Sequence, residues 1–373
     1  MVERRLVTLA VRPGAAMESQ SGLQMLAPQI SGAFAQPAGP RDLACIVMHP
    51  TSNFMNHYLI DPLAQRGIAC LGLNSRYAGS DTTLLMERVL QDLGAGVRFL
   101  RNEGYRRVVL IGNSGGAALV SFYQAQAERL TVTQTAAGDP VDLSPEDLPP
   151  CDGIVLCAAH AGRARLFLEW IDPSVIDEAD PVATDPALDC YDPRNGPPFS
   201  SAFLSRFAEA QRQRRDALER RVLARLRQLR ANPDGPQDMA FCIHRTHADP
   251  RMVDLSLDPN DRAHGSIWGD PRRVNGGANA MGRFTTLTAF LSQWSSLSHA
   301  DGPDNLARTS VPVKFFEYTG DASTFPSTAK LWAAAAGDRF DAQRLVGANH
   351  YLAGQPDHIR TVADAISLWA RHL

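Results

Sequence analysis

The sequence of 373 residues predicts an α/β protein in which helices flank a mostly parallel sheet. Three observations support this prediction. From residue 43 onward, short apolar runs alternate with helical patterns, which is typical of parallel strands joined by crossover helices. The alternation stops near residue 160 and returns only near residue 311. In addition, one apolar run ends in a serine between glycines, at the junction of a predicted strand and a predicted helix.

The apolar runs, rich in β-branched residues, predict the central strands. These strands are expected at residues 45–49, 68–74, 107–113, 153–159, 311–318 and 342–348. Helical patterns predict helices near residues 54–66, 83–103, 115–129, 326–337 and 357–372. Two earlier runs, residues 5–11 and 23–37, look like antiparallel strands at the edge of the sheet.

The interval between the two halves of the alternation is too long for a simple crossover connection. We therefore expect a core in residues 1–160, an inserted cap in residues 161–310, and the remainder of the core in residues 311–373. Within the insertion, residues 203–230 predict a long helix with an apolar stripe and many arginines. Connectors rich in proline and aspartate surround this helix, so the cap is expected to be mainly helical with long loops.

The composition excludes some classes of partner. The formal net charge of -3 and the pI near 6.4 provide no overall field that attracts nucleic acid or an anionic membrane surface. No apolar stretch is long enough for a signal peptide or a membrane span. Six scattered cysteines without a Cys-x-x-Cys pair favour buried, reduced thiols and a cytoplasmic protein. We therefore expect no nucleic-acid or membrane partner, and the sequence offers no motif for a metal or another cofactor.

The serine between glycines is Ser114, at the end of the run 107–113. A serine on a tight strand-to-helix turn adopts a strained backbone conformation that only small neighbours accommodate, and Gly112, Gly115 and Gly116 provide that space. The turn projects the hydroxyl above the carboxyl end of the strand, beside the N-terminus of the next helix. The pattern therefore predicts a nucleophile. A glycine-rich phosphate loop is the alternative, but no Gly-Lys-Ser/Thr follows.

A serine hydroxyl needs a base, and the base needs an orienting acid. Asp321 follows the predicted strand 311–318, and His350 follows the last predicted strand. In an open α/β sheet, these loops share the edge at which Ser114 lies. The chain order serine, aspartate, histidine matches the order expected on such a sheet. We therefore predict that Ser114, Asp321 and His350 form a catalytic triad.

Each partner has an alternative. His299 and His358 are competing bases, but they lie at the exit of the cap and on a terminal helix. For Asp321 the alternative is a turn or helix-cap residue, because Gly-Asp before Ser or Thr is ordinary turn chemistry. In that case Asp172 or Asp177 is the second choice for the acid.

Residues 43–160 and 311–373 resemble the α/β-hydrolase fold superfamily, and in particular its serine esterases and lipases. The matching features are His49-Pro50, Gly112-Asn113-Ser114-Gly115-Gly116, Gly320-Asp321 and Asn349-His350. The resemblance implies an eight-stranded sheet, a cap over the active site and hydrolysis of esters or related acyl compounds. It covers about half of the chain and does not specify the cap.

The resemblance also implies an oxyanion hole, formed by the amide of Gly115 and by a second amide in the loop after residues 45–49. The sequence departs here from the common His-Gly pattern. Pro50 has no N–H, so the second donor is expected to be Thr51 or Ser52. We interpret His49 as a structural residue of this loop.

Substrate selectivity is expected in the loops and the cap. The candidates for substrate binding are Asn53, His57, His160 and Trp268. Each has a structural alternative: a helix cap for Asn53 and a packed, hydrogen-bonded ring for His160. Trp268 and Trp294 fit either the pocket or the core of the cap.

The sequence therefore predicts a serine hydrolase that cleaves a carboxylic ester or related acyl compound, a small molecule, through an acyl-serine intermediate. Thioesters, amides and C–C bonds of diketones are alternative substrates for the same residues. Acyl transfer to an alcohol or amine, and a non-enzymatic receptor for a small molecule, remain open. The arginines of residues 203–230 fit an anionic ligand or a solvated, ion-paired helix, and the apolar stripe of that helix fits a homodimer contact.

Overall fold

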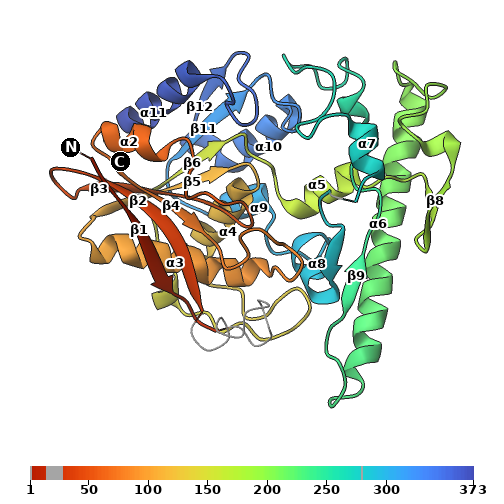
Figure 1. The fold of residues 1–373 in the computed structure, drawn as a ribbon, viewed down its shortest axis with the longest axis horizontal. Coiled ribbons are helices and arrows are strands. Elements are labelled where there is room, and N and C mark those ends of the chain that lie inside the picture. The colour runs from red at the N-terminus through yellow and green to blue at the C-terminus, as the bar shows by residue number, and fades with distance from the viewer. Residues whose placement is uncertain (1, 14–27, 279) are drawn as a thin grey trace.

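The computed structural model describes residues 2–13, 28–278 and 280–373, and its centre is an eight-stranded sheet (Figure 1). The strands are β1 (Val2–Ala10), β2 (Gln29–Pro37), β3 (Leu43–His49), β4 (Ala69–Asn74), β5 (Arg107–Asn113), β6 (Gly153–Cys157), β11 (Val313–Tyr318) and β12 (Phe340–Leu345). Their order across the sheet is β1-β2-β4-β3-β5-β6-β11-β12. β2 pairs antiparallel with β1 and β4, and the other neighbours pair parallel. The predicted mostly parallel sheet is thus confirmed.

The predicted strands are present, with small shifts at their ends. The strand expected at residues 342–348 begins at Phe340 and ends at Leu345. The edge strand expected at residues 23–37 begins at Gln29, and residues 23–27 lie outside the described residues. β1 and β2 form the antiparallel edge pair, as expected.

Helices cover both faces of the sheet (Figure 1). One face carries α2 (Ile60–Gln65) and α11 (Pro356–Ala370). The other carries α3 (Met86–Asn102), α4 (Gly116–Glu128), α9 (Gly302–Leu306) and α10 (Pro326–Ala336). α2 begins six residues later than the predicted position 54, because two turns precede it, in which the amides of His57 and Ile60 donate to the carbonyls of Phe54 and His57. These turns place Phe54 and His57 beside the carboxyl ends of the central strands.

The insertion, residues 161–310, joins β6 to β11 and extends to one side of the sheet (Figure 1). Its elements are α5 (Arg163–Trp170), β7 (Val175–Asp177), β8 (Asp180–Thr184), α6 (Ser201–Arg230), β9 (Ala240–Cys242), α7 (Pro271–Gly276), β10 (Phe284–Thr286), α8 (Leu287–Gln293) and α9. β7 with β8 and β9 with β10 form two small antiparallel sheets, which the sequence did not predict. α9 lies in this segment but packs against α4 and α10 of the core. The limits of the cap, residues 161 and 310, therefore stay a prediction.

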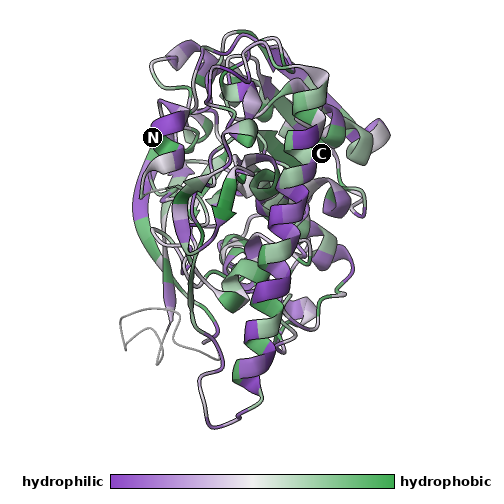
Figure 2. Cartoon of the chain, turned by 90° about the vertical axis from the view of Figure 1, so that its right-hand side faces the viewer, coloured by the Kyte–Doolittle hydropathy of each residue, from purple (hydrophilic) through white to green (hydrophobic). Residues whose placement is uncertain are grey.

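The long helix predicted at residues 203–230 is α6, which begins at Ser201. Its apolar stripe is buried inside the insertion, where Leu218, Val222 and Leu226 pack with residues of α5 and α8. Several of its arginines form ion pairs, among them Arg214 with Glu178 and Arg212 with Glu209. Figure 2 shows hydrophilic residues along its outward side. The stripe is therefore part of the apolar core of the insertion. A homodimer stays a prediction.

Among the described residues, no helix combines the length and the apolar character that crossing a membrane requires.

Candidate active site

Ser114 lies at a sharp turn between β5 and α4 with a φ of 57°, in the left-handed region that non-glycine residues rarely adopt. Glycine is required at positions 112 and 116 because backbone atoms of other residues lie very close to where a Cβ atom would be. A Cβ on Gly112 would lie 2.6 Å from the Cα of Ala117, and a Cβ on Gly116 would lie 2.3 Å from the carbonyl oxygen of Met48. The turn therefore depends on the absence of side chains at Gly112 and Gly116.

The structure brings the three predicted residues together. The Nε2 atom of His350 lies 3.0 Å from the Oγ of Ser114, and its Nδ1 lies 2.7 Å from the Oδ2 of Asp321. Asp321 follows β11 and His350 follows β12, so the residues come from separate loops at the carboxyl edge of the sheet. Both side chains of the His–Asp pair are buried. These distances allow a proton to pass from the hydroxyl to the imidazole.

Asp321 accepts hydrogen bonds from two further residues, Ser323 and Thr324. Its Oδ1 accepts from the amide and hydroxyl of Ser323, and its Oδ2 accepts from the hydroxyl of Thr324 at 2.6 Å. Burial raises the pKa of Asp321, but the charge of His350 and the bonds from His350 and Thr324 outweigh it and lower the pKa to about 2. The carboxylate is thus ionised at neutral pH. The Ser323 hydroxyl also lies 3.0 Å from the Nδ1 of His350.

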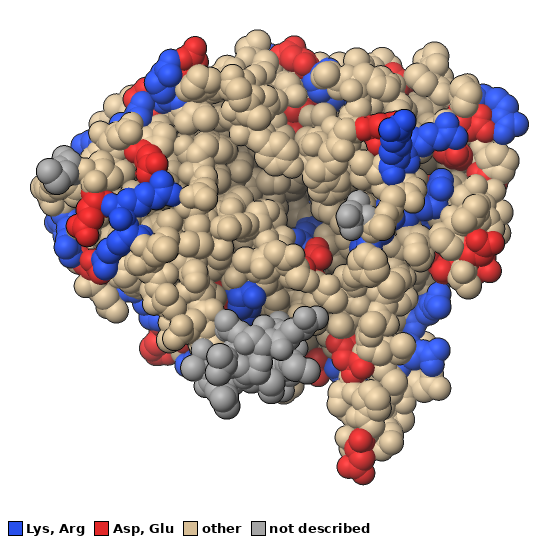
Figure 3. Space-filling model, in the orientation of Figure 1, with Lys and Arg blue, Asp and Glu red and all other residues tan. Residues whose placement is uncertain are grey.

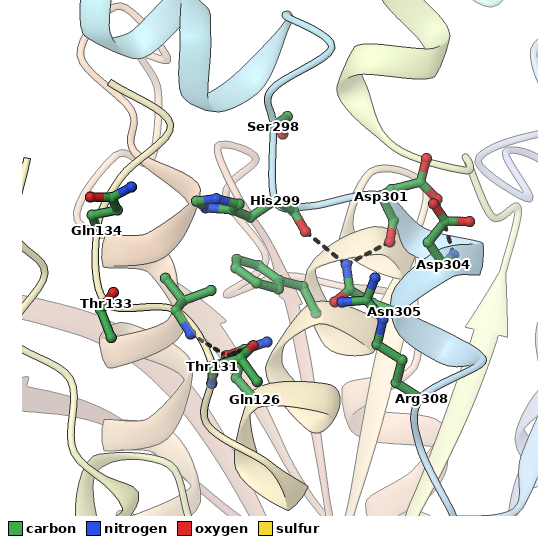
Figure 4. Close-up of a pocket in the computed structure, with 12 residues that line it drawn as sticks. Gln126, Thr131, Thr133, Gln134, Ser298, His299, Asp301, Asp304, Asn305 and Arg308 are labelled. Carbon is green, nitrogen blue, oxygen red and sulfur yellow. Dashed lines mark hydrogen bonds between the residues drawn. The ribbon is translucent and has the colours of Figure 1, made fainter. Parts of the chain in front are cut away.

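The alternative bases and acids lie elsewhere. His299 contacts Glu87, with 2.8 Å between Nδ1 and Oε1. It lines a separate cavity of about 350 Å³, whose walls come from α4, the loop after it and the start of α9; Ser114 does not line it (Figure 4). Asp172 binds Arg245 and Asn275 inside the insertion. His358 lies on α11, and Asp177 lies in β7.

A cavity of about 470 Å³ opens beside Ser114, between the sheet edge and the insertion. The four residues expected to bind substrate, Asn53, His57, His160 and Trp268, all line it. Apolar and aromatic side chains dominate its walls, and the sequence did not single out most of them: Phe54, Tyr58, Leu166, Trp170, Met281 and Tyr351. Figure 3 shows a hollow near the centre of the drawn face. Most of the charged side chains on that face lie toward the outer edge of the molecule. The cavity thus offers an apolar site beside the hydroxyl.

The cavity histidines are neutral at pH 7. Burial lowers the pKa of His57 to about 4, against a smaller opposing effect of the bond to Asn113. Burial and the charge of His350 lower the pKa of His160 to about 3. His160 also packs edge-on against Trp170, with 6.2 Å between ring centroids. His160 is therefore both a packed ring and a wall of the cavity.

Asn53, Trp294 and Trp268 each have a defined structural environment. The Oδ1 of Asn53 accepts from the amide of Met55 and from the side chain of Asn74, each at 3.1 Å, so Asn53 stabilises a loop and does not cap a helix. Trp294 is fully buried in the core of the insertion and does not line the cavity. Trp268 is 41% exposed and stacks on His247, with ring centroids 5.1 Å apart.

The expected oxyanion loop differs from the prediction. Gly115, Thr51 and Ser52 all line the cavity. However, the amides of Thr51 and Ser52 donate to the Nδ1 of His49, at 3.1 and 2.9 Å. The sequence analysis expected one of these two amides to face the serine instead. The cause is the imidazole of His49, which accepts both N–H groups.

Arg163 ties the insertion to this loop and was not predicted. Its guanidinium donates to the Oδ2 of Asp81 and to the Oγ1 of Thr51, each at 2.8 Å. It also lies over the ring of Trp294, 4.8 Å from the centroid. Arg163 and Asp81 line the cavity as an ion pair. The opposite charges of these two side chains offset each other at the cavity wall.

The described residues include no group of three His, Cys, Asp or Glu side chains that are placed to hold a metal ion. Their cysteines are free thiols, and all except Cys242 are buried. Burial raises the pKa of Cys45 and Cys157 to about 12. These two side chains are therefore neutral thiols at pH 7.

Comparison with known proteins gives only distant likenesses. No family model and no curated protein matches the chain. Among solved structures, the esterase domain of a Rhodothermus marinus protein is 13% identical, with a TM-score of 0.47 and 99% of each chain covered. A putative hydrolase from Agrobacterium vitis S4 is 14% identical, with a TM-score of 0.46 and 98% of each chain covered. A monoacylglycerol lipase from Paleococcus ferrophilus is 13% identical, with a TM-score of 0.44, covering 91% of this chain and 97% of its own.

The strand order, the helices on both faces and the position of Ser114 after β5 are those of the α/β-hydrolase fold. The chain has this fold.

Proposed function

We propose that the chain is a serine hydrolase that cleaves a carboxylic ester or a related acyl compound. The observation that carries the proposal is the continuous contact from the Oγ of Ser114 through both ring nitrogens of His350 to the buried carboxylate of Asp321. A serine hydroxyl reacts only when a base takes its proton, and a base works best when its tautomer and orientation are fixed. His350 provides the base, and its contact with Asp321 fixes the tautomer and orientation of the ring.

In the proposed reaction, the Oγ of Ser114 attacks the substrate carbonyl while its proton moves to the Nε2 of His350. Asp321 stays ionised, holds the Nδ1–H of His350 and stabilises the imidazolium that forms. The amide of Gly115, at the N-terminus of α4, donates to the new oxyanion. The intermediate then expels the leaving alcohol, which takes the proton from His350. Water, activated by the same imidazole, cleaves the acyl-serine and releases the acid.

The size and walls of the cavity support a small acyl substrate. Its volume of about 470 Å³ lies within the range typical of small-molecule sites. Aromatic side chains from the core and the insertion surround the space next to Ser114. We therefore propose that the preferred acyl group is apolar and bulky enough to contact Trp170 and Trp268, rather than a short polar one.

A panel of chromogenic esters with acetyl, hexanoyl and benzoyl groups tests the proposal. The wild type is expected to release the chromophore in a burst followed by a slower steady rate, because the acyl-serine accumulates. Ser114→Ala is expected to lose both phases while keeping its thermal unfolding midpoint. Hydrolysis of every ester by folded Ser114→Ala at the wild-type rate would contradict the proposal.

The same panel separates the related reactions. Acyl thioesters, anilides and a diketone measure the thioesterase, amidase and C–C hydrolase alternatives. Added alcohols detect acyl transfer as a new ester product. A receptor would bind these compounds with no turnover, and Ser114→Ala would leave its binding unchanged.

A further inference from the structure

His49, interpreted from the sequence as a structural residue, lies against the serine turn. Its ring lines the same cavity as Ser114 and Gly115. A Cβ placed on Gly115 would lie only 2.8 Å from the Nε2 of His49, so this nitrogen contacts the residue whose amide follows the nucleophile. The ring also packs on Phe54, with 5.5 Å between centroids. The Nε2 atom thus lies beside Gly115, the residue that follows the nucleophile, at the wall of the cavity.

The hydrogen bonds of the loop determine which ring nitrogen of His49 carries the proton. The backbone N–H groups of Thr51 and Ser52 both donate to Nδ1. An N–H group only donates, so Nδ1 accepts with its lone pair and carries no hydrogen. A neutral imidazole then has its single proton on Nε2. No acceptor among the described residues is recorded for that N–H.

The surroundings keep this ring neutral. Burial lowers the pKa of His49 well below its ordinary value, and the nearby charge of Arg163 acts in the same direction. Arg163 also holds the hydroxyl of Thr51, which fixes the loop around the ring. The result is a rigid, uncharged N–H donor beside the nucleophile, with its acceptor position open to the cavity.

We propose that the Nε2–H of His49 is the second donor of the oxyanion hole, together with the amide of Gly115. This inference rests on the proposed serine hydrolase function and names a catalytic residue for that reaction. The side chain replaces the backbone donor that Pro50 lacks and that Thr51 and Ser52 direct elsewhere. His49 keeps its proton throughout, and only the hydrogen bond to the substrate oxygen strengthens as negative charge develops.

His49→Asn is the most direct variant, because its Oδ1 takes the place of Nδ1 as acceptor for the loop and it has no ε nitrogen. Removal of one oxyanion donor lowers kcat by about 10²- to 10³-fold in well-studied hydrolases. We expect a loss of this order, with KM for an ester within about threefold of wild type and an unchanged unfolding midpoint. His49→Gln, which restores an N–H near the ε position, is expected to be more active than His49→Asn.

A transition-state analogue separates stabilisation of the oxyanion from a structural role. Phenylboronic acid forms a tetrahedral adduct with an active serine, and one of its oxygens occupies the oxyanion position. Its inhibition constant for His49→Asn is expected to rise by the same factor by which kcat/KM falls. A kcat within threefold of wild type, or a kcat loss without weaker boronate binding, would overturn the assignment.

Nitrogen-15 NMR of the wild-type imidazoles provides a test that needs no variant. The inference predicts an unprotonated Nδ1 and a protonated Nε2 for His49, and a downfield shift of the Nε2–H resonance when phenylboronic acid binds. A proton on Nδ1, or an Nε2–H that does not shift in the adduct, would overturn the inference. Failure of the proposed function looks different, because Ser114→Ala would then retain activity and boronate would form no adduct.

Discussion

The sheet core and the insertion both reach the cavity, but they are built differently. In the core, Ser114, Asp321 and His350 are held by hydrogen bonds and by a backbone turn that needs small neighbours. In the insertion, Trp170 and Trp268 reach the cavity through side-chain packing on a short helix and a loop. The difference indicates that the core supplies the chemistry, while the insertion supplies walls that can change without disturbing it.

The core and the insertion also differ in whether their buried polar side-chain atoms have hydrogen-bond partners. Among the described residues, the buried side-chain nitrogens and oxygens without a hydrogen-bond partner belong to four residues of the insertion. They are Trp170, Ser174, His247 and Trp294. Each such atom costs about 1–3 kcal/mol relative to a paired one. The insertion is therefore the less completely bonded part of the molecule, and substitutions there are expected to affect stability and selectivity before chemistry.

The largest expected effect is the loss of the base. His350→Gln removes the Nε2 that faces Ser114, and we expect kcat to fall by about 10⁵- to 10⁶-fold. The matched control is His358→Gln, eight residues further along the chain on α11, which is expected to keep the wild-type rate. Steady-state hydrolysis of a benzoyl ester measures both. An inactive control beside an active His350→Gln would place the base elsewhere.

The second-largest expected effect is the loss of kcat in Asp321→Asn, and a second buried aspartate, Asp172, serves as the comparison. Asp321→Asn is expected to lower kcat by about 10⁴-fold, because the amide no longer holds the required tautomer of His350. Asp172→Asn, in the insertion, removes the carboxylate that binds Arg245 and is expected to lower the unfolding midpoint with kcat within threefold of wild type. Denaturation and kinetics on both variants check this. Equal losses of kcat in the two variants would contradict the assignment of the chemistry to the core alone.

A smaller effect on KM is expected for Trp268→Ala, whereas Trp294→Ala is expected to affect stability. Trp268→Ala removes a half-exposed wall, so KM for the benzoyl ester is expected to rise about tenfold while the acetyl ester is unaffected. Trp294→Ala removes a fully buried ring and is expected to cost about 3–5 kcal/mol of stability. A KM profile unchanged by Trp268→Ala would mean that the acyl group lies on the core side of the cavity.

The smallest effect concerns pH. The pKa of His160 in the folded chain is about 3, below the value near 6.5 of an unfolded histidine. The unfolded state binds more protons between these values, so stability falls as the pH decreases through this window. The contribution is about 2 kcal/mol between pH 7 and pH 5. Urea unfolding of His160→Gln is expected to show a weaker loss over that interval, and an identical pH dependence would refute the buried, neutral state.

Much of the core could be predicted because its signals are local. The β-branched run before Gly112 and the glycines around Ser114 specify a strand, a turn and a helix within a few residues. Asp321 was ambiguous for a physical reason, since one oxygen makes the expected turn bond to Ser323 while the other faces His350. The two interpretations of that residue therefore describe the same side chain.

The unpredicted parts depend on tertiary packing. Arg163 and Trp170 line the cavity because of how α5 packs against α6, and no periodic pattern in the sequence predicts that packing. The direction of the Thr51 and Ser52 amides depends on the position of the His49 ring, so residue types alone could not identify the second oxyanion donor. The small sheets of the insertion have strands of only three to five residues, too short for an alternating pattern to identify.

The most direct measurement is reaction of the intact, folded protein with a fluorophosphonate, followed by peptide mass spectrometry. The account predicts one adduct, on Ser114, and a labelling rate at least 10³-fold lower in His350→Gln. An unmodified Ser114 in folded protein, or an adduct on another serine, would contradict the claim that these distant loops assemble a nucleophile and its base.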